Sequence, residues 1–290
     1  MDKLGLIKEL RERTNGGMVD CKKALEESDW DIEKAITWLK SNGKIKAAKK
    51  ADRVSAEGLV AIAANKSKAV MVEVNCETDF VARNEKFKAL VEKIAILILD
   101  SKVKSVDEVL KLKSGKETVA DLCENLTATI GEKITFRRFE VVETKKGEIL
   151  GHFVHVTGQI AAIVKISGTH EESARNVAMH LSAMKPEFIF VKDIPAERIQ
   201  LFRDEFVVPA NFDKKPVKVQ EMIREGSLNK KIGEVALEEQ PFMMEESLTI
   251  NKYLANHKGK LVSAIRYGVG EGIQKATSDF ASEVAAQMKQ

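Results

Sequence analysis

One order of secondary structure occurs twice along this chain, and it limits the possible folds more than any other feature. Residues 58–76 contain two apolar, strand-like segments, and the polar residues 65–68 between them are typical of a hairpin turn. Residues 148–168 contain a second pair of such segments. A helical stretch follows each pair, at residues 85–98 and 171–184. Because strands and helices are grouped in this way, the sequence predicts an α+β core of two related subdomains.

The elements outside this repeat are predicted from apolar spacing and from turn residues. In the first fifty residues, three short helices are indicated by apolar faces at Leu6, Ile7 and Leu10, then Met18, Cys21 and Leu25, then Ile32, Ala35, Ile36 and Leu39. Gly43 predicts the end of the third helix. The later segments are a helix at 117–131 ending at Gly131, a strand at 133–143, a protruding antiparallel helix pair within 196–237, a helix and a strand within 248–272, and an amphipathic helix at 279–289.

Residues 40–55 are rich in lysine and poor in large apolar side chains. They are interpreted as a solvated connector that is helical in part. A segment that contacts RNA is the alternative. The connector is favoured because no aromatic residues are interleaved for base stacking.

Composition and charge point to a protein of the cytosol. The 290 residues carry 47 Lys and Arg against 44 Asp and Glu, a formal net charge of +3, and the two signs are mixed along the chain. This pattern lacks the basic stripe of a nucleic-acid-binding protein. The first ten residues interleave charges with Leu and Ile, unlike a signal peptide. The longest aliphatic run, residues 94–99, is too short to span a bilayer.

The sequence offers no set of residues typical of an enzyme or a metal site. Cys21, Cys76 and Cys123 lie far apart in apolar stretches and are odd in number, so they are predicted to be buried and unpaired. His152 and His155 are three apart in a strand, which places them on opposite faces. The glycines of residues 267–275 lack the GxGxxG spacing and predict a bend after a strand. We therefore expect no cofactor, no metal and no enzymatic activity.

One aromatic residue lies where aromatics are scarce. Thr78, Asp79 and Phe80 form a polar turn between the second strand and its helix. The corresponding residues 167–173 of the second copy contain no aromatic, so the architecture does not require one. Phe80 is therefore predicted to face a partner. The alternative is that Phe80 packs into the protein's own core, where phenylalanine is usually found.

Five stretches of the chain resemble the bacterial elongation factor Ts family, in the family's order. They are LRERTNGGMVDCKKALEES, EVNCETDFVARNEKF, AMHLSAMKPEF, GEVALEEQPFM and GVGEGI. The resemblance runs over essentially the whole chain, and the three-helix start also resembles a ubiquitin-associated fold.

The pattern of helices and strands, together with the resemblance, predicts a division of the chain. It comprises a three-helix, ubiquitin-associated-like domain with a basic linker at 1–54, α+β core subdomains at 55–143 and 144–273, and a C-terminal helical module at 274–290. The second subdomain includes the helical hairpin at about 196–237. In the family this hairpin can mediate homodimers or a complex of two copies of each partner.

The family's activity implies a guanine-nucleotide exchange factor. Such a protein binds elongation factor Tu, in its nucleotide-free or GDP form, and promotes GDP release so that GTP can bind during translation elongation. It binds no nucleotide itself and carries out no covalent chemistry. By resemblance, Phe80 enters the GTPase domain near the Mg²⁺ site, and Asp79 orients the turn or bonds to the partner. The alternative function is an RNA-binding translation accessory protein, and a third is a small-molecule enzyme.

Further partner contacts are implied by matching motifs. They are Met18, Val19, Lys22, Thr78, Ile130, Gly131, His155, Met243 and Met244. Several have a structural alternative: Met18 also falls on an apolar stripe, Lys22 suits a solvated surface, Gly131 suits a helix end, and the two methionines suit a core. His155 is followed by Val156 and Thr157 where the family has glycines, so this loop departs from the family pattern.

Overall fold

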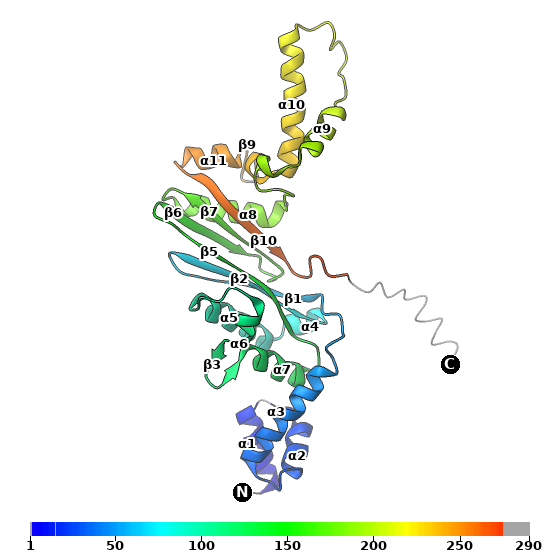
Figure 1. The fold of residues 1–290 in the computed structure, drawn as a ribbon, viewed down its shortest axis with the longest axis vertical. Coiled ribbons are helices and arrows are strands. Elements are labelled where there is room, and N and C mark those ends of the chain that lie inside the picture. The colour runs from blue at the N-terminus through cyan, green and yellow to red at the C-terminus, as the bar shows by residue number, and fades with distance from the viewer. Residues whose placement is uncertain (1, 15, 275–290) are drawn as a thin grey trace, which may run out of the picture. The chain divides into compact units, whose positions relative to one another are not determined.

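The computed structural model describes residues 2–14 and 16–274. The amphipathic helix predicted at 279–289, and with it almost all of the predicted module at 274–290, lies outside the described residues. Helices and strands are both present in quantity, which confirms the predicted α+β class (Figure 1). Within the described ranges, no helix combines the length and the apolar character needed to cross a membrane.

The chain divides into two compact units, and each unit is built from segments that are not continuous in the sequence. Among the described residues, the first unit comprises 2–14, 16–61, 72–139 and 268–274, and the second comprises 62–71 and 140–267. The first unit therefore begins at the N-terminus and receives the chain again after the last strand.

Three helices form the beginning of the first unit, as predicted. They are α1 (Lys3–Thr14), α2 (Met18–Glu26) and α3 (Ile32–Ala48). Their small core consists of Ile7, Leu10, Cys21, Ala24, Leu25 and Ala35. Asp31 caps α3 by accepting a hydrogen bond from the backbone N–H of Lys34 at 2.9 Å, which satisfies a donor that the helix itself leaves free.

The end of α3 differs from the prediction. The helix passes through Gly43 and continues to Ala48, so much of the expected connector is helical. Gly43 is buried, and a Cβ at this position would lie 3.4 Å from the Cβ of Ala128 in α7 (Val119–Ile130). The glycine allows close packing of the two helices instead of ending one of them, which is a tertiary effect that local propensity does not report.

The predicted hairpin at 58–76 is confirmed. Strands β1 (Glu57–Ala64) and β2 (Lys68–Cys76) join β5 (Thr135–Glu143) in a three-stranded sheet of order β1-β2-β5. The side chain of Asn65 accepts hydrogen bonds from the backbone N–H groups of Ser67 at 3.0 Å and Lys68 at 2.9 Å. This Asx arrangement closes the turn.

Helices of the first unit follow the hairpin. They are α4 (Asp79–Ala82), α5 (Glu85–Leu99), α6 (Val106–Lys111) and α7, and the short strands β3 (Lys113–Ser114) and β4 (Glu117–Thr118) precede α7. The predicted apolar face of α5 is confirmed, because Phe87, Leu90, Val91, Ile94 and Ile98 are all buried. Cys21, Cys76 and Cys123 are buried and unpaired, as expected.

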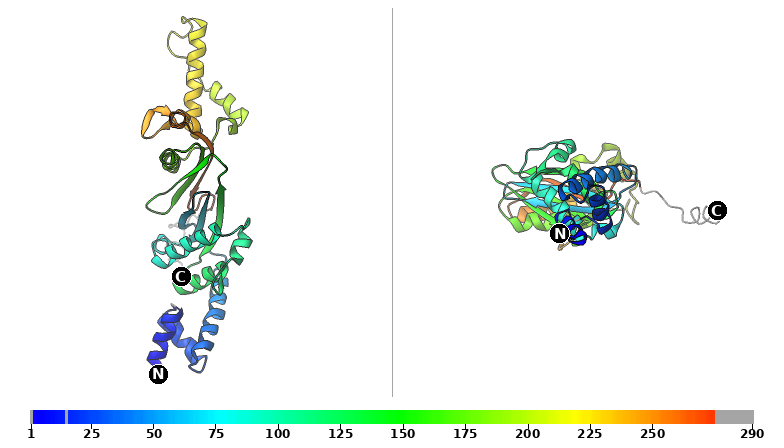
Figure 2. Two further views of the ribbon diagram at one scale, coloured as in Figure 1. Left: turned by 90° about the vertical axis from the view of Figure 1, so that its left-hand side faces the viewer. Right: turned by 90° about the horizontal axis from the view of Figure 1, so that it is seen from below.

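The second unit repeats the motif. Strands β6 (Glu148–Val154), β7 (Ile160–Ser167) and β10 (Lys260–Gly268) form a sheet of order β10-β7-β6. Helix α8 (Glu171–Met184) lies against one face of β6 and β7 (Figure 2). Gly151 permits this contact, since a Cβ there would lie 2.1 Å from the carbonyl carbon of Ala174.

The remaining elements of the second unit include the predicted helical hairpin. Helices α9 (Ala196–Asp204) and α10 (Val217–Val235) project from the sheet of this unit (Figure 1). Their base is held by a cluster of Ile194, Phe202, Ile232, Val235 and Ala236. The unit is completed by β8 (Pro241–Phe242), β9 (Glu245–Thr249) and α11 (Ile250–Asn256).

Candidate functional site

Phe80 lies on a single helical turn at the end of β2. The expected polar turn is the short helix α4, with Thr78 as its N-cap residue. The next two residues, Val81 and Ala82, are 7% and 4% exposed, whereas Phe80 is 80% exposed. The buried pair anchors the turn, and the helical geometry then directs Phe80 outward. The alternative in which this ring packs into its own core is therefore excluded.

Thr78 is held by a residue far away in the sequence. Its backbone N–H donates to Oε2 of Glu132 at 3.0 Å, and its hydroxyl donates to Oε1 of the same carboxylate at 2.7 Å. In the opposite direction, the backbone N–H of Lys133 donates to the carboxylate of Glu77 at 2.6 Å. Residues 77–78 and residues 132–133 thus hydrogen-bond to each other in both directions. Charge-assisted bonds of this kind are stronger than neutral ones, so the base of α4 is firmly placed.

Asp79 forms an ion pair within the same turn. Its carboxylate lies 2.8 Å from the guanidinium of Arg83, four residues later, and the two side chains are 43% and 77% exposed. Exposed pairs of this spacing contribute little to stability. Asp79 therefore presents a carboxylate beside Phe80 at the surface.

The turn of Ile130 and Gly131 lies beside this site. Gly131 ends α7 in the left-handed region, at φ 92°, which favours glycine. Its N–H donates to the carbonyl of Thr127 at 2.9 Å, and its own carbonyl accepts from Lys50 Nζ. Because the chain turns sharply at Gly131, the next residue, Glu132, lies within hydrogen-bond distance of Thr78. The structure therefore brings together two of the predicted contact segments, 78–80 and 130–131, through a residue that sequence reasoning missed.

The glycine-rich segment after β10 contacts the same sheet. The carboxylate of Glu73, in β2, is fully buried and accepts a hydrogen bond from the backbone N–H of Gly270 at 2.8 Å. Gly270 has φ 73°, and a Cβ there would lie 2.3 Å from the carbonyl oxygen of Ala56. The positive φ of Gly270 confirms the predicted bend, and its N–H is not available to a phosphate because an internal carboxylate accepts it.

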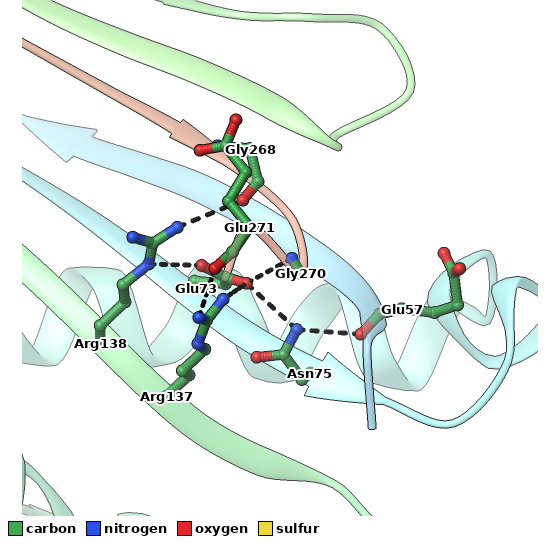
Figure 3. Close-up of polar contacts among 8 residues, drawn as sticks. All are labelled: Glu57, Glu73, Asn75, Arg137, Arg138, Gly268, Gly270 and Glu271. Carbon is green, nitrogen blue, oxygen red and sulfur yellow. Dashed lines mark hydrogen bonds and ion pairs between the residues drawn. The ribbon is translucent and has the colours of Figure 1, made fainter. Parts of the chain in front are cut away.

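Two arginines complete the surroundings of Glu73 (Figure 3). Arg137 and Arg138, both in β5, lie 2.9 Å and 2.6 Å from its two oxygens. Asn75 donates a further bond at 3.1 Å. Burial raises the pKa of Glu73, but these donors and Gly270 lower it more, so its pKa lies below the ordinary value. The ionised carboxylate ties β2, β5 and the final bend together.

Comparison with known proteins identifies the family of this arrangement. A family model described as elongation factor TS matches residues 77–271, which include α4, Glu132 and the glycine-rich bend. A relative from Mycoplasmopsis synoviae (strain 53) named Elongation factor Ts is 50% identical over 289 residues, covering 99% of each chain. The chain belongs to the elongation factor Ts family.

Other members of the elongation factor Ts family match over the same length. The protein from Mycoplasmopsis agalactiae (strain NCTC 10123 / CIP 59.7 / PG2) is 52% identical over 295 residues, with 99% of each chain covered. The protein from Lactiplantibacillus plantarum (strain ATCC BAA-793 / NCIMB 8826 / WCFS1) is 43% identical over 283 residues, covering 98% of this chain and 97% of the relative. The chain is thus a translation elongation factor of this family.

The N-terminal residues that resemble the family's contact motif are on the surface. Met18 and Val19, in the first turn of α2, are 48% and 81% exposed. Lys22 is exposed as well, and its ammonium lies 3.7 Å from the carboxylate of Glu26. The structural alternative for Met18, a place on the apolar stripe, is wrong, because α2 buries Cys21, Ala24 and Leu25 while Met18 lies outside the small core. Met18, Val19 and Lys22 are therefore exposed, and their contact with a partner stays a prediction.

His155 lies in the turn between β6 and β7. Its Nδ1 is 2.8 Å from the hydroxyl of Thr157, and the N–H of Gly158 donates to its carbonyl at 2.8 Å. Val156 is 93% exposed. The turn is closed by these bonds even though the family's glycines are replaced. Its contact with a partner stays a prediction.

Met243 and Met244 form the turn between β8 and β9. They are 44% and 53% exposed, so the core alternative does not hold for either. The N–H of Met243 donates to Nδ1 of His180 at 3.2 Å, and Nε2 of His180 is 3.1 Å from Oε1 of Gln240. His180 is fully buried, and burial lowers its pKa, although the bond to Gln240 raises it. Since the backbone N–H is a donor, His180 is neutral with its proton on Nε2.

No sequence pattern indicates the supporting role of His180. It lies on α8, where helical spacing places it beside an apolar face, and Gln240 is 60 residues away. A histidine on such a face is ordinarily read as part of the core. Only the hydrogen bond to the turn of Met243 shows that it supports a predicted contact.

Proposed function

We propose that this chain is the guanine-nucleotide exchange factor for elongation factor Tu. It binds the GDP form of that GTPase, accelerates GDP release, and dissociates after GTP has bound. The observation that carries the proposal is an aromatic side chain, Phe80, that is 80% exposed on a turn whose base is firmly bonded. Membership of the elongation factor Ts family supports it.

The thermodynamics of exchange require contacts that are stronger with the nucleotide-free GTPase than with its GDP form. A protein that binds the nucleotide-free GTPase more tightly than the GDP form lowers GDP affinity by the same factor. Each tenfold change in rate corresponds to about 1.4 kcal/mol. Burying an exposed Phe side chain in a partner supplies about 1.5–3 kcal/mol. One inserted ring therefore provides one to two orders of magnitude, and the remaining contacts supply the rest.

The preorganised conformation of α4 reduces the entropy cost of inserting Phe80 into a partner. A flexible loop loses conformational entropy when it is ordered at an interface, which subtracts from binding. In α4 this ordering is complete before binding, because Thr78 is bonded and Val81 and Ala82 are buried. Phe80 is then inserted near the Mg²⁺ and nucleotide site of the GTPase, and the adjacent Asp79 bonds to a donor of the partner.

The other predicted contacts extend this interface. Met18, Val19 and Lys22 contact the GTPase domain, Ile130 and Gly131 extend the Phe80 site, and His155, Met243 and Met244 contact the rest of the partner. The helical hairpin of α9 and α10 provides a surface for a second copy of the complex. The exchange itself proceeds by binding alone, in the cytoplasm, with no cofactor and no bond made or broken by this chain.

Release of a fluorescent GDP from elongation factor Tu tests the proposal. The variant Phe80→Ala is expected to slow the maximal release rate about 10- to 100-fold, the range given by losing 1.5–3 kcal/mol. The matched control is Ile96→Ala, another large apolar residue of the first unit that is 54% exposed, on α5. The control is expected to match the unaltered protein. Equal release rates with Phe80→Ala and the unaltered protein would remove Phe80 from the mechanism, and absence of any stimulated release would overturn the proposal.

A further inference from the structure

The hydrogen-bond partners of the Thr78 side chain determine where its hydroxyl proton lies. The carboxylate of Glu132 only accepts, so the single hydroxyl proton of Thr78 points to it, at 2.7 Å. The hydroxyl oxygen then offers its lone pairs to the N–H of Val81, at 3.4 Å, which is the capping bond of α4. Glu132 also accepts the Thr78 backbone N–H at 3.0 Å. Glu132 thus sets both the backbone and the side chain that begin the turn of Phe80.

The alternatives for holding this turn are weaker. The pair of Asp79 and Arg83 lies in solvent and stays within α4 itself. Val81 and Ala82 fix the depth of the turn by burial, yet apolar contacts have no directional preference. The carboxylate of Glu132 is bonded through both oxygens, and it links α4 to the chain that leaves α7.

We propose that Glu132 is the positioning residue for Phe80: it holds the aromatic wedge in the orientation that opens the partner's nucleotide site. This inference rests on the proposed exchange function. Glu132 acts through Thr78, because each of its carboxylate oxygens accepts a hydrogen bond from that residue. Its loss is therefore expected to lower the maximal rate of GDP release, while the concentration that gives half-maximal release changes little.

The test compares six forms of the full-length protein in GDP release from elongation factor Tu. They are the unaltered chain, Phe80→Ala, Glu132→Ala, Glu132→Gln, Phe80→Ala combined with Glu132→Ala, and Glu92→Gln. Glu92 is an exposed acidic residue of α5 and controls for the loss of one charge. Thermal unfolding of each variant reports whether it is folded, and release is measured over a range of protein concentrations.

Glu132→Ala is expected to lower the maximal release rate about tenfold, as fits the loss of a charge-assisted hydrogen bond. Glu132→Gln keeps an acceptor for the Thr78 N–H and is expected to lie between Ala and the unaltered chain. The double variant is expected to equal Phe80→Ala, because a positioning residue has no effect once the group it positions is gone.

Three outcomes overturn the inference while leaving the exchange function intact. One is a Glu132→Ala protein whose maximal rate of GDP release equals that of the unaltered chain, while the rate of Phe80→Ala is reduced. Another is a double variant that is slower than Phe80→Ala by the full factor of Glu132→Ala, since additivity means an independent role. The third is a Glu132→Ala protein in which only the protein concentration for half-maximal release changes, while the maximal rate does not. A Phe80→Ala protein that releases GDP as fast as the unaltered chain contradicts the proposed role of Phe80 itself. This outcome is distinguishable from the three above, in which Phe80→Ala is slow.

Discussion

The backbone N–H of Met243 donates a hydrogen bond to Nδ1 of the buried His180 at 3.2 Å. This bond requires a neutral imidazole, because a protonated ring has no acceptor. A turn that is predicted to contact the partner is therefore supported by a group whose charge depends on pH.

The first prediction concerns this histidine. Burial lowers the pKa of His180 below its ordinary value in the folded protein, although its bond to Gln240 raises it. In the unfolded chain His180 binds a proton near its ordinary pKa of about 6.5, while the folded protein does not, so stability falls as the pH drops through and below that value. The stabilising contribution is fully present above about pH 6.5 and declines towards the lower folded-state pKa. Urea unfolding from about pH 7.5 to about pH 5.5 measures it.

The matched variant for this prediction is His180→Gln, which cannot gain a proton. It is expected to be less stable than the unaltered protein at neutral pH because the bond to Met243 is disturbed. It is also expected to lose part of the pH dependence in this window. Identical slopes of stability against pH for the two proteins would contradict the role given to His180.

The second prediction concerns the buried carboxylate of Glu73. The substitution Glu73→Gln removes the negative charge that Arg137 and Arg138 face. Breaking a buried ion pair costs about 3–5 kcal/mol, and we expect the lower end because these arginines are 24% and 32% exposed. Denaturant unfolding measures the loss, with Glu92→Gln as the control for a surface charge. A loss no greater than that of the control would refute the structural role of Glu73.

The pH dependence of the Glu73 contribution has a defined sign. Burial raises its pKa, but its hydrogen bonds lower it more, so the folded-state pKa lies below the unfolded-state value of about 4.3. The stabilisation is therefore fully present above about pH 4.3 and is lost as the pH falls through the folded-state pKa. The Glu73→Gln protein is expected to lack this component of acid unfolding.

The third prediction contrasts two glycines. Gly131 has φ 92°, where an alanine costs about 1–2 kcal/mol, so Gly131→Ala is expected to destabilise by that amount. Gly226 lies inside α10 with ordinary helical backbone and open space around it, so Gly226→Ala is expected to stabilise by about 0.5–1 kcal/mol. The two opposite shifts are measured as changes in the free energy of unfolding. A stabilised Gly131→Ala protein would show that the turn tolerates another conformation.

The fourth prediction tests the N-terminal contact and rests on the proposed function. Val19→Asp is expected to weaken binding to elongation factor Tu about tenfold, because a charge is placed in an apolar contact. Its stability is expected to be unchanged, since Val19 is 81% exposed. The control is Ile96→Asp at an exposed position of α5. Titration calorimetry with the nucleotide-free GTPase measures both, and equal affinities for the two variants would remove Val19 from the interface.

Local pattern was sufficient for most elements and for the exposure of Phe80. The apolar face of α5, the hairpin turn at Asn65 and the end of α7 at Gly131 each depend on neighbouring residues, so the sequence alone predicts them. Phe80 was predicted to face outward because the second copy of the motif lacks an aromatic, and the two buried residues after it supply the physical reason.

Local pattern failed where a distant element decided the outcome. The sequence predicts that a helix ends at Gly43, but α3 packs against α7 there and continues beyond it. The spacing of Met18 also fits an apolar stripe, the alternative to its predicted partner contact, but the three-helix core is too small to cover the first turn of α2.

The sequence by itself determined the class of fold, the family and the presence of an aromatic at position 80. The tertiary structure decided how that aromatic is held: Thr78 and Glu132 are 54 residues apart and meet only after α7 has turned at Gly131. It likewise decided that His180 supports the turn of Met243. The physical reason is that spacing along a chain reports which residues share a helix face or a strand, whereas hydrogen bonds between segments depend on the packing of the whole unit.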